Sequence, residues 1–142
     1  GRLRPVFLPW FVGTDIYHCG APGGKNIGGT SSLTSGIISR IGVRITEFGG
    51  GSEYGIFDQT DTAALGGSSG GMIALKSDGR WIGMITLGLG GGDNFHWFVP
   101  VRSVRAWAEE IKVMWLLDPS LLRPTEKDVK NIILECRSGK KK

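Results

Sequence analysis

The sequence predicts a mainly β protein: an antiparallel barrel or sandwich of about six strands, followed by one or two helices. Its 24 glycines gather in clusters between apolar runs, which is typical of short strands joined by tight turns. Several of these runs are rich in β-branched residues. After residue 102, apolar residues recur three and four positions apart, which indicates helices instead.

The first half of the chain contains three predicted strands. Residues 14–19 form the first, which ends at a stretch of glycine and proline. Residues 32–45 form one long or bent strand, and its glycines, Gly36 and Gly42, are expected at β-bulges. After a turn at the three glycines 49–51, residues 54–59 form the third strand.

The second half contains three more strands and the helices. Residues 72–76 and 81–87 flank Asp78-Gly79, a strong hairpin signal. Residues 95–101 form the last strand, after a turn of glycines.

A helix is expected after Ser103 as its N-cap, and it should stop at Asp118-Pro119. Residues Thr125 to Asp128 resemble a capping box and begin a second apolar face. A basic tail, residues 137–142, ends the chain.

Length and composition exclude several classes of protein. With 142 residues the chain is one domain or part of a larger one. No apolar stretch approaches the ~20 residues of a membrane span. Much of the net charge of +4 lies at the ends, and no basic stripe alternates with aromatic residues, so we expect no nucleic-acid partner. The two cysteines and two histidines form no metal-ligand cluster, and no cofactor is expected. The cellular compartment stays undetermined.

A serine framed by glycines, at residues 67–71, is the main chemical signal. Acyl transfer needs a hydroxyl on a turn whose backbone N–H groups also face the substrate carbonyl. The same letters match the nucleophile elbow of α/β-hydrolases, but that elbow needs a strand before the serine and a helix after it. Here a loop precedes the serine and a hairpin follows. A phosphate-binding loop is poorly supported, because no Gly-Lys-Ser/Thr ends the glycine run.

Five segments in order resemble the second β-barrel of HtrA-type, trypsin-like (chymotrypsin-fold) serine proteases, over roughly residues 12–115. They are residues 34–39, 58–61, 67–71, 79–83 and 98–101. The family motif has asparagine before the nucleophile and proline after the glycine pair, where this chain has Ser68 and Met72.

The resemblance implies roles for individual residues. Ser69 matches the nucleophile, and the backbone N–H groups of Gly67 and Ser69 match the oxyanion hole. Ala63 matches the floor of the primary specificity pocket. Its lack of charge favours a small or medium aliphatic side chain at the cleavage site. Asp61 is expected to anchor the loop. The resemblance places one strand on the pocket wall, with residues Ile85, Thr86, Leu87 and Gly88.

The general base of such a protease is missing from this chain. His18 and His96 match no catalytic position, and both are expected to be structural. In the family, the catalytic His and Asp come from a preceding barrel. The implied organisation is a linker or N-terminal segment at 1–11, the second barrel at 12–101, helices at 102–136, and the tail.

Three interpretations stay open. The chain is the nucleophile-bearing half of a serine endopeptidase, an inactive protease-fold binding or scaffold protein, or a viral or phage protein that retains a protease half. The expected partners are a polypeptide substrate and an N-terminal protease barrel, from the same precursor or a separate chain. Because the barrel–barrel face is open in a half-protease, association of the chain with itself is also expected.

Overall fold

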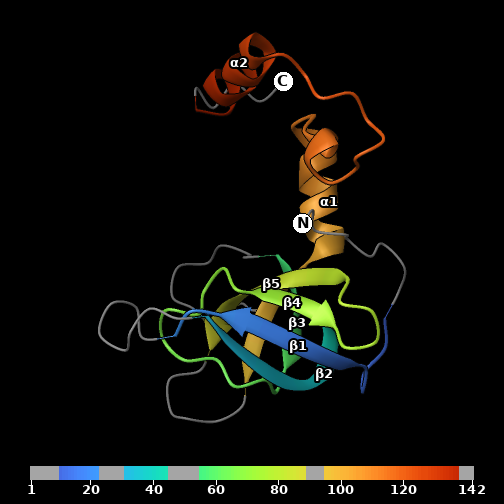
Figure 1. Ribbon diagram of the computed structural model, residues 1–142, viewed down its shortest axis with the longest axis vertical. Coiled ribbons are helices and arrows are strands. Elements are labelled where there is room, and N and C mark those ends of the chain that lie inside the picture. Colours follow the sequence, from blue (N-terminus) through green and yellow to red (C-terminus); the bar gives the residue numbers. More distant parts are fainter. Residues whose placement is uncertain (1–9, 23–30, 45–54, 89–94, 138–142) are drawn as a thin grey trace. The chain divides into compact units, whose positions relative to one another are not determined.

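The computed structural model describes residues 10–22, 31–44, 55–88 and 95–137 (Figure 1). The chain divides into two compact units, Gly1–Ser103 and Val104–Lys142. The turns predicted at residues 49–51 and 90–93, and residues 138–142 of the predicted tail, lie outside the described residues.

The first unit is a closed antiparallel barrel, which confirms the predicted class and decides between a barrel and a sandwich. Around the barrel the strands follow the order β1-β2-β3-β6-β5-β4, so β1 closes it by pairing with β4. The strands are β1 (Asp15–Gly20), β2 (Ser32–Arg44), β3 (Ile56–Thr60), β4 (Met72–Leu75), β5 (Trp81–Gly88) and β6 (His96–Pro100).

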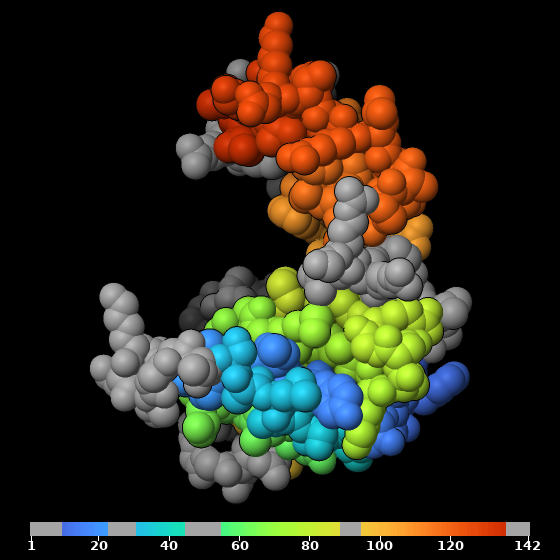
Figure 2. Space-filling view, in the orientation of Figure 1, coloured from blue at the N-terminus to red at the C-terminus, as the bar shows by residue number. Residues whose placement is uncertain are grey.

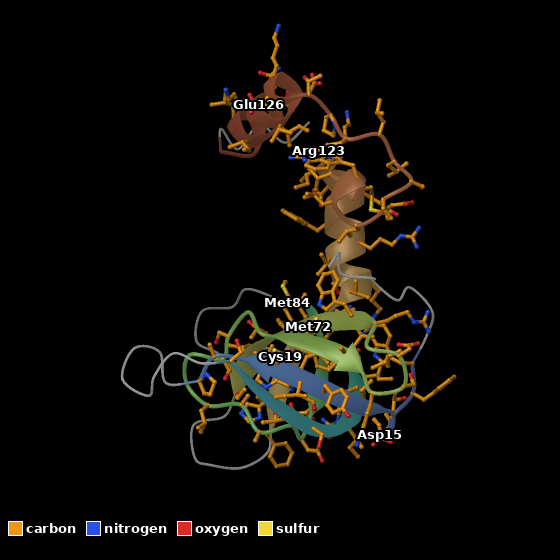
Figure 3. The ribbon with its side chains drawn as sticks, viewed as in Figure 1. Asp15, Cys19, Met72, Met84, Arg123 and Glu126 are labelled. Atoms are coloured by element: carbon orange, nitrogen blue, oxygen red, sulfur yellow. The ribbon has the colours of Figure 1, made fainter. Side chains whose placement is uncertain are left out.

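Alternation along the strands separates the core from the surface. In β1, Ile16, His18 and Gly20 are buried, while the residues between them are more exposed. On the outside, Cys19, Met72 and Met84 stand opposite one another on β1, β4 and β5 (Figure 3). The space-filling view shows this face, with β1 and β2 crossing it in blue and cyan (Figure 2). Among the described residues, the largest fully buried side chains are Phe98, Ile16, Ile38, Ile73, Ile82 and His18.

Glycine is required at the two glycine positions of β2 for different reasons. Gly42 has φ +75° and lies within a register shift between Arg40 and Val43, so the bulge predicted there is confirmed. Gly36 pairs in regular register with Ile16, so the bulge predicted at Gly36 is wrong. A side chain at position 36 would collide with Asp61 and Thr62, because the loop after β3 crosses directly over it.

The helices depart from the predicted boundaries. They are α1 (Val101–Glu110), a 3₁₀ turn η2 (Met114–Leu116) and α2 (Glu126–Arg137). Because β6 passes directly into α1, Ser103 lies inside the first turn and is not the N-cap. The long first helix predicted up to Asp118 is also wrong, since Lys112 adopts a left-handed φ of 60° and interrupts it.

The capping box before α2 is confirmed. Thr125 Oγ1 donates to Asp128 Oδ2 at 2.6 Å, and the Asp128 N–H donates back to Thr125 Oγ1 at 3.3 Å. No helix in the described ranges is long and apolar enough to span a membrane.

The carboxylate of Asp58, buried at the centre of β3, joins three parts of the barrel unit. Trp10 Nε1 donates to Oδ2 at 2.9 Å, and the N–H of Gly42 donates to Oδ1 at 2.9 Å. The Arg102 guanidinium makes two further bonds, at 2.7 and 2.5 Å, and stacks 5.4 Å from the Trp10 ring centroid. Trp10, at the end of the predicted linker, is therefore part of the barrel core.

Asp58→Ala should lower the free energy of unfolding by about 3 kcal/mol, because it leaves several donors of a buried network without an acceptor. Urea denaturation measures the change. The stability of Asp58→Asn, which keeps one carbonyl acceptor, should lie between that of Asp58→Ala and that of the unsubstituted protein. The matched control is Asp15→Ala, an exposed carboxyl on β1, which should change stability by less than about 0.5 kcal/mol. Equal effects of the two alanine substitutions would contradict the role of Asp58.

Candidate active site

The loop that carries Ser69 runs from Asp61 to Gly71 between β3 and β4, and several strands hold it. Asp61 Oδ1 accepts from the Ile37 N–H of β2 at 2.7 Å, which confirms its predicted role as a loop anchor. Thr34 Oγ1, also on β2, donates to the Ala63 carbonyl oxygen at 2.9 Å. The loop returns to the sheet through Ile85, whose N–H donates to the Gly71 carbonyl oxygen at 2.9 Å.

Ser69 lies on a tight bend between antiparallel strands. Gly67 and Gly70 on either side have φ of +97° and +85°, a backbone conformation that few other residues adopt. The Ser69 side chain is exposed, and its hydroxyl donates to the Thr86 carbonyl oxygen over 3.5 Å. Ser68 points the other way and is 3% exposed. The bend therefore presents the Ser69 hydroxyl to solvent.

The backbone N–H groups of the bend fall into two sets, those bonded within the fold and those without an acceptor in it. Those of Ser68, Gly70 and Gly71 donate within the fold, to the carbonyl oxygens of Leu65, Ile85 and Ser68 at 3.0, 2.8 and 2.9 Å. Among the described residues, no acceptor is found for the N–H of Gly67 or Ser69. The two N–H groups that the resemblance assigns to the oxyanion hole are thus the two left free for a ligand.

The four residues predicted on the pocket wall do not share one environment. Ile85 is 3% exposed, and its backbone groups bind Gly70 and Gly71, so it holds the loop. Its place on the pocket wall stays a prediction. The pairing of β5 with β6 shifts register between Ile85 and Leu87, which sets Thr86 at an irregularity. Gly88, at the end of β5, is exposed, as is Ala63.

His18 lies inside the barrel beneath this loop, 1% exposed. Its Nδ1 is 3.3 Å from both the Ala63 carbonyl oxygen and Thr34 Oγ1, which confirms that the ring is a hydrogen-bonded core residue. Burial lowers the pKa of His18 below its ordinary value of 6.5. The carbonyl oxygens of Ala63 and Ser68 oppose this shift, and the charge of His96 adds to it. The ring is therefore neutral at pH 7.

No base for Ser69 is found in the described part of the chain. The hydroxyl has Thr86 as its hydrogen-bond partner, and neither histidine ring bonds to it. His96 lies on β6, opposite Thr60 and Gly88, as expected for a residue of the barrel wall. Within the described ranges, no group of three or more His, Cys, Asp or Glu side chains could hold a metal ion.

Sequence reasoning missed the support beneath the loop. Thr34 lies in a segment that carries the resemblance, but nothing in the sequence indicates that its hydroxyl binds Ala63. His18 was expected to be structural without a named partner. The two residues meet the loop only because β1 and β2 pair in a register that sets His18 opposite Thr34.

Comparison with known proteins supports the fold. No family model matches the chain, and no curated protein matches its sequence. Among solved structures, the HtrA-type protease AlgW with a bound decapeptide aligns with a TM-score of 0.61 and 24% identity, over 87% of this chain and 35% of AlgW. Rv3671c from M. tuberculosis, a serine-to-alanine mutant in an inactive form, aligns with a TM-score of 0.63 and 18% identity, over 78% of this chain and 53% of that protein.

Deg5 aligns similarly, with a TM-score of 0.54 and 23% identity over 82% of this chain. The chain spans only 35% to 53% of the length of these three structures. The first unit therefore has the chymotrypsin-like barrel fold of HtrA-type serine proteases, as the resemblance in sequence predicted.

Proposed function

We propose that this chain is the nucleophile-bearing half of a serine endopeptidase. The observation that carries the proposal is the bend at residues 67–71. Its serine hydroxyl is exposed, and the N–H groups of Gly67 and Ser69 have no acceptor among the described residues, while those of Ser68, Gly70 and Gly71 are bound within the fold. The fold shared with HtrA-type proteases supports it.

In this proposal Ser69 Oγ attacks the carbonyl carbon of the scissile peptide bond and forms a tetrahedral oxyanion. The N–H groups of Gly67 and Ser69 stabilise that oxyanion. A base on an N-terminal barrel, supplied by the same precursor or a separate chain, takes the hydroxyl proton and passes it to the leaving amine. Water then hydrolyses the acyl-enzyme and releases the second product, with the same base accepting a proton from the water.

A second function, peptide binding without hydrolysis, is favoured by one observation. Neither histidine of this chain bonds to Ser69, so these residues alone lack the group that activates a serine. A protease-fold binding module would use the exposed end of β5, from Thr86 to Gly88, to pair with an extended peptide.

We expect Ser69 to react with a fluorophosphonate probe when this chain is expressed within its complete natural gene product. Mass spectrometry of the labelled peptide identifies the serine. Ser69→Ala should abolish labelling, whereas Ser35→Ala, an exposed serine of β2, should leave it unchanged. Absence of labelling in a folded complete protein that still binds peptide would favour the binding module. The 142 residues alone should label very slowly.

The uncharged Ala63 should give cleavage after small or medium aliphatic side chains, because no carboxylate compensates a buried cation. Cleavage of a peptide library by the complete protein measures this preference. Ala63→Asp should raise cleavage after Lys and Arg relative to aliphatic residues. If the unsubstituted protein cleaved only after basic residues, the assignment of Ala63 to the pocket floor would be wrong.

A further inference from the structure

We infer that His18 is a positioning residue: its neutral imidazole, bonded to Ala63 and lying against the turn at Ser68, holds the loop that carries Ser69, and protonation of the ring changes that hold. The inference deepens the proposed function and rests on it for its effect on catalysis. The effect on the loop itself does not depend on catalysis.

The ring touches both limbs of the loop. On one side Nδ1 lies 3.3 Å from the Ala63 carbonyl oxygen. On the other side, a Cβ on Gly71 would lie 2.6 Å from Nε2, and a Cβ on Gly20 would lie 2.7 Å from it. The ring therefore occupies the space that side chains at these two positions would need, directly under the turn that precedes β4.

The hydrogen-bond network assigns the tautomer. The Thr34 hydroxyl donates to the Ala63 carbonyl oxygen, so both groups near Nδ1 act as acceptors, and Nδ1 carries the proton. Nε2 is then an acceptor, buried without a partner among the described residues. The Ser68 hydroxyl is a buried donor that also has no partner among the described residues. The Ser68 Cβ lies 3.2 Å from where a Cβ on Gly20 would be.

Protonation changes the hydrogen-bond partner that Nε2 requires. A charged imidazole donates from both nitrogens, so Nε2–H needs an acceptor. The nearby acceptor is the Ser68 carbonyl oxygen, which already receives the Gly71 N–H at 2.9 Å and so closes the turn around Ser69. That oxygen has two lone pairs and can accept both donors, but a new bond to the ring draws it towards His18 and so changes the geometry of the turn. A displacement of about 1 Å at a nucleophile costs roughly 10²-fold in rate.

Few other charges reach the ring. Of the elements packed against it, β6 contributes His96, whose charge lowers the pKa of His18 in the same direction as burial. Strand β2 contributes the neutral Thr34, and β1 contributes Cys19 as the next residue. Asp61, the carboxylate of the loop, is bound to the Ile37 N–H on β2. Among the described residues, His96 is thus the charged group that acts on the ring.

Selective labelling of histidine and glycine with ¹⁵N in the complete protein tests the inference by NMR. Between pH 7.5 and 5, the amide signals of Gly70 and Gly71 should shift along the titration curve of His18. In His18→Asn, whose amide nitrogen replaces the Nδ1 donor but does not titrate, those shifts should vanish. Glycine signals that do not follow His18, with a folded protein throughout, would overturn the inference.

The direction of the pH effect on stability follows from the lowered pKa. Below about pH 6.5 the unfolded chain takes up a proton that the folded chain refuses, so lowering the pH favours unfolding. The loss grows until the pH falls below the pKa of His18 in the folded protein. The urea midpoint should therefore fall more steeply between pH 6.5 and 5 in the natural protein than in His18→Asn. Equal slopes would count against a buried neutral ring.

The effect of His18 on catalysis is tested by the rate at which the fluorophosphonate probe labels Ser69 at pH 7.5. His18→Leu, which fills the space without a donor, should slow labelling of Ser69 by roughly tenfold or more, and His18→Asn should restore it to within about threefold. Equal rates in Leu and Asn variants that both fold would overturn the catalytic part. If the natural protein is not labelled at all while its glycine signals still follow His18, the proposed function fails and the positioning role stands.

A pair of glycine substitutions checks the geometry. Gly20→Ala should lower the urea midpoint in the natural protein and cost much less in His18→Ala, because the methyl group then enters the vacated space. Gly71→Ala should cost the same in both backgrounds, since Cys19 O and Ser68 O also lie within 2.8 Å of its Cβ position. The placement of the ring would be contradicted if His18→Ala reduced the cost of Gly71→Ala, or if it did not reduce the cost of Gly20→Ala.

Discussion

The buried carboxylate of Asp58 is the interaction on which the barrel unit most depends. A charge that has left water is stable only when donors surround it, and here the donors come from three distant parts of the chain. Trp10 precedes the first strand, Gly42 lies at the bulge of β2, and Arg102 lies in the first turn of α1. One side chain thereby fixes where the chain enters the barrel, where its longest strand bends, and where the strand pattern gives way to helix.

The nucleophile loop solves a related problem. A loop that crosses the end of a barrel must find partners for its backbone, or remain exposed to water. The strands supply most of these partners through Asp61, Thr34 and Ile85. In the part of the chain that the structure describes, the N–H groups of Gly67 and Ser69 have no such partner, and they lie beside the exposed hydroxyl. The loop is thus hydrogen-bonded to the strands at its base and exposed at its tip.

The sequence predicted the strands well because each combines β-branched residues with a clear turn signal. The Asp78-Gly79 hairpin is an example, with the Asp78 carboxylate accepting from the Arg80 N–H at 3.0 Å. The helix boundaries were predicted less well. Ser103 is a good N-cap by composition, but Arg102 is held by Asp58, so the helix begins earlier. The apolar spacing past Glu110 continues without a helix because Lys112 turns left-handed.

The placement of Ser69 on the bend could be anticipated from its glycines, whereas the contacts beneath it could not. Sequence spacing does not reveal that Gly36 makes room for a loop 25 residues away, or that Ile85 faces inward. Both features depend on the strand register, which is determined by the pairing of all the strands in the barrel.

The space around His18 has a consequence for how such sequences diverge. At position 20 the obstacle is a side chain, so a lineage that replaces the imidazole with a small residue is free to replace this glycine as well. At position 71 the obstacle includes backbone oxygens, which no substitution removes. Homologous chains should therefore show residues 18 and 20 changing together, while residue 71 remains glycine in every branch.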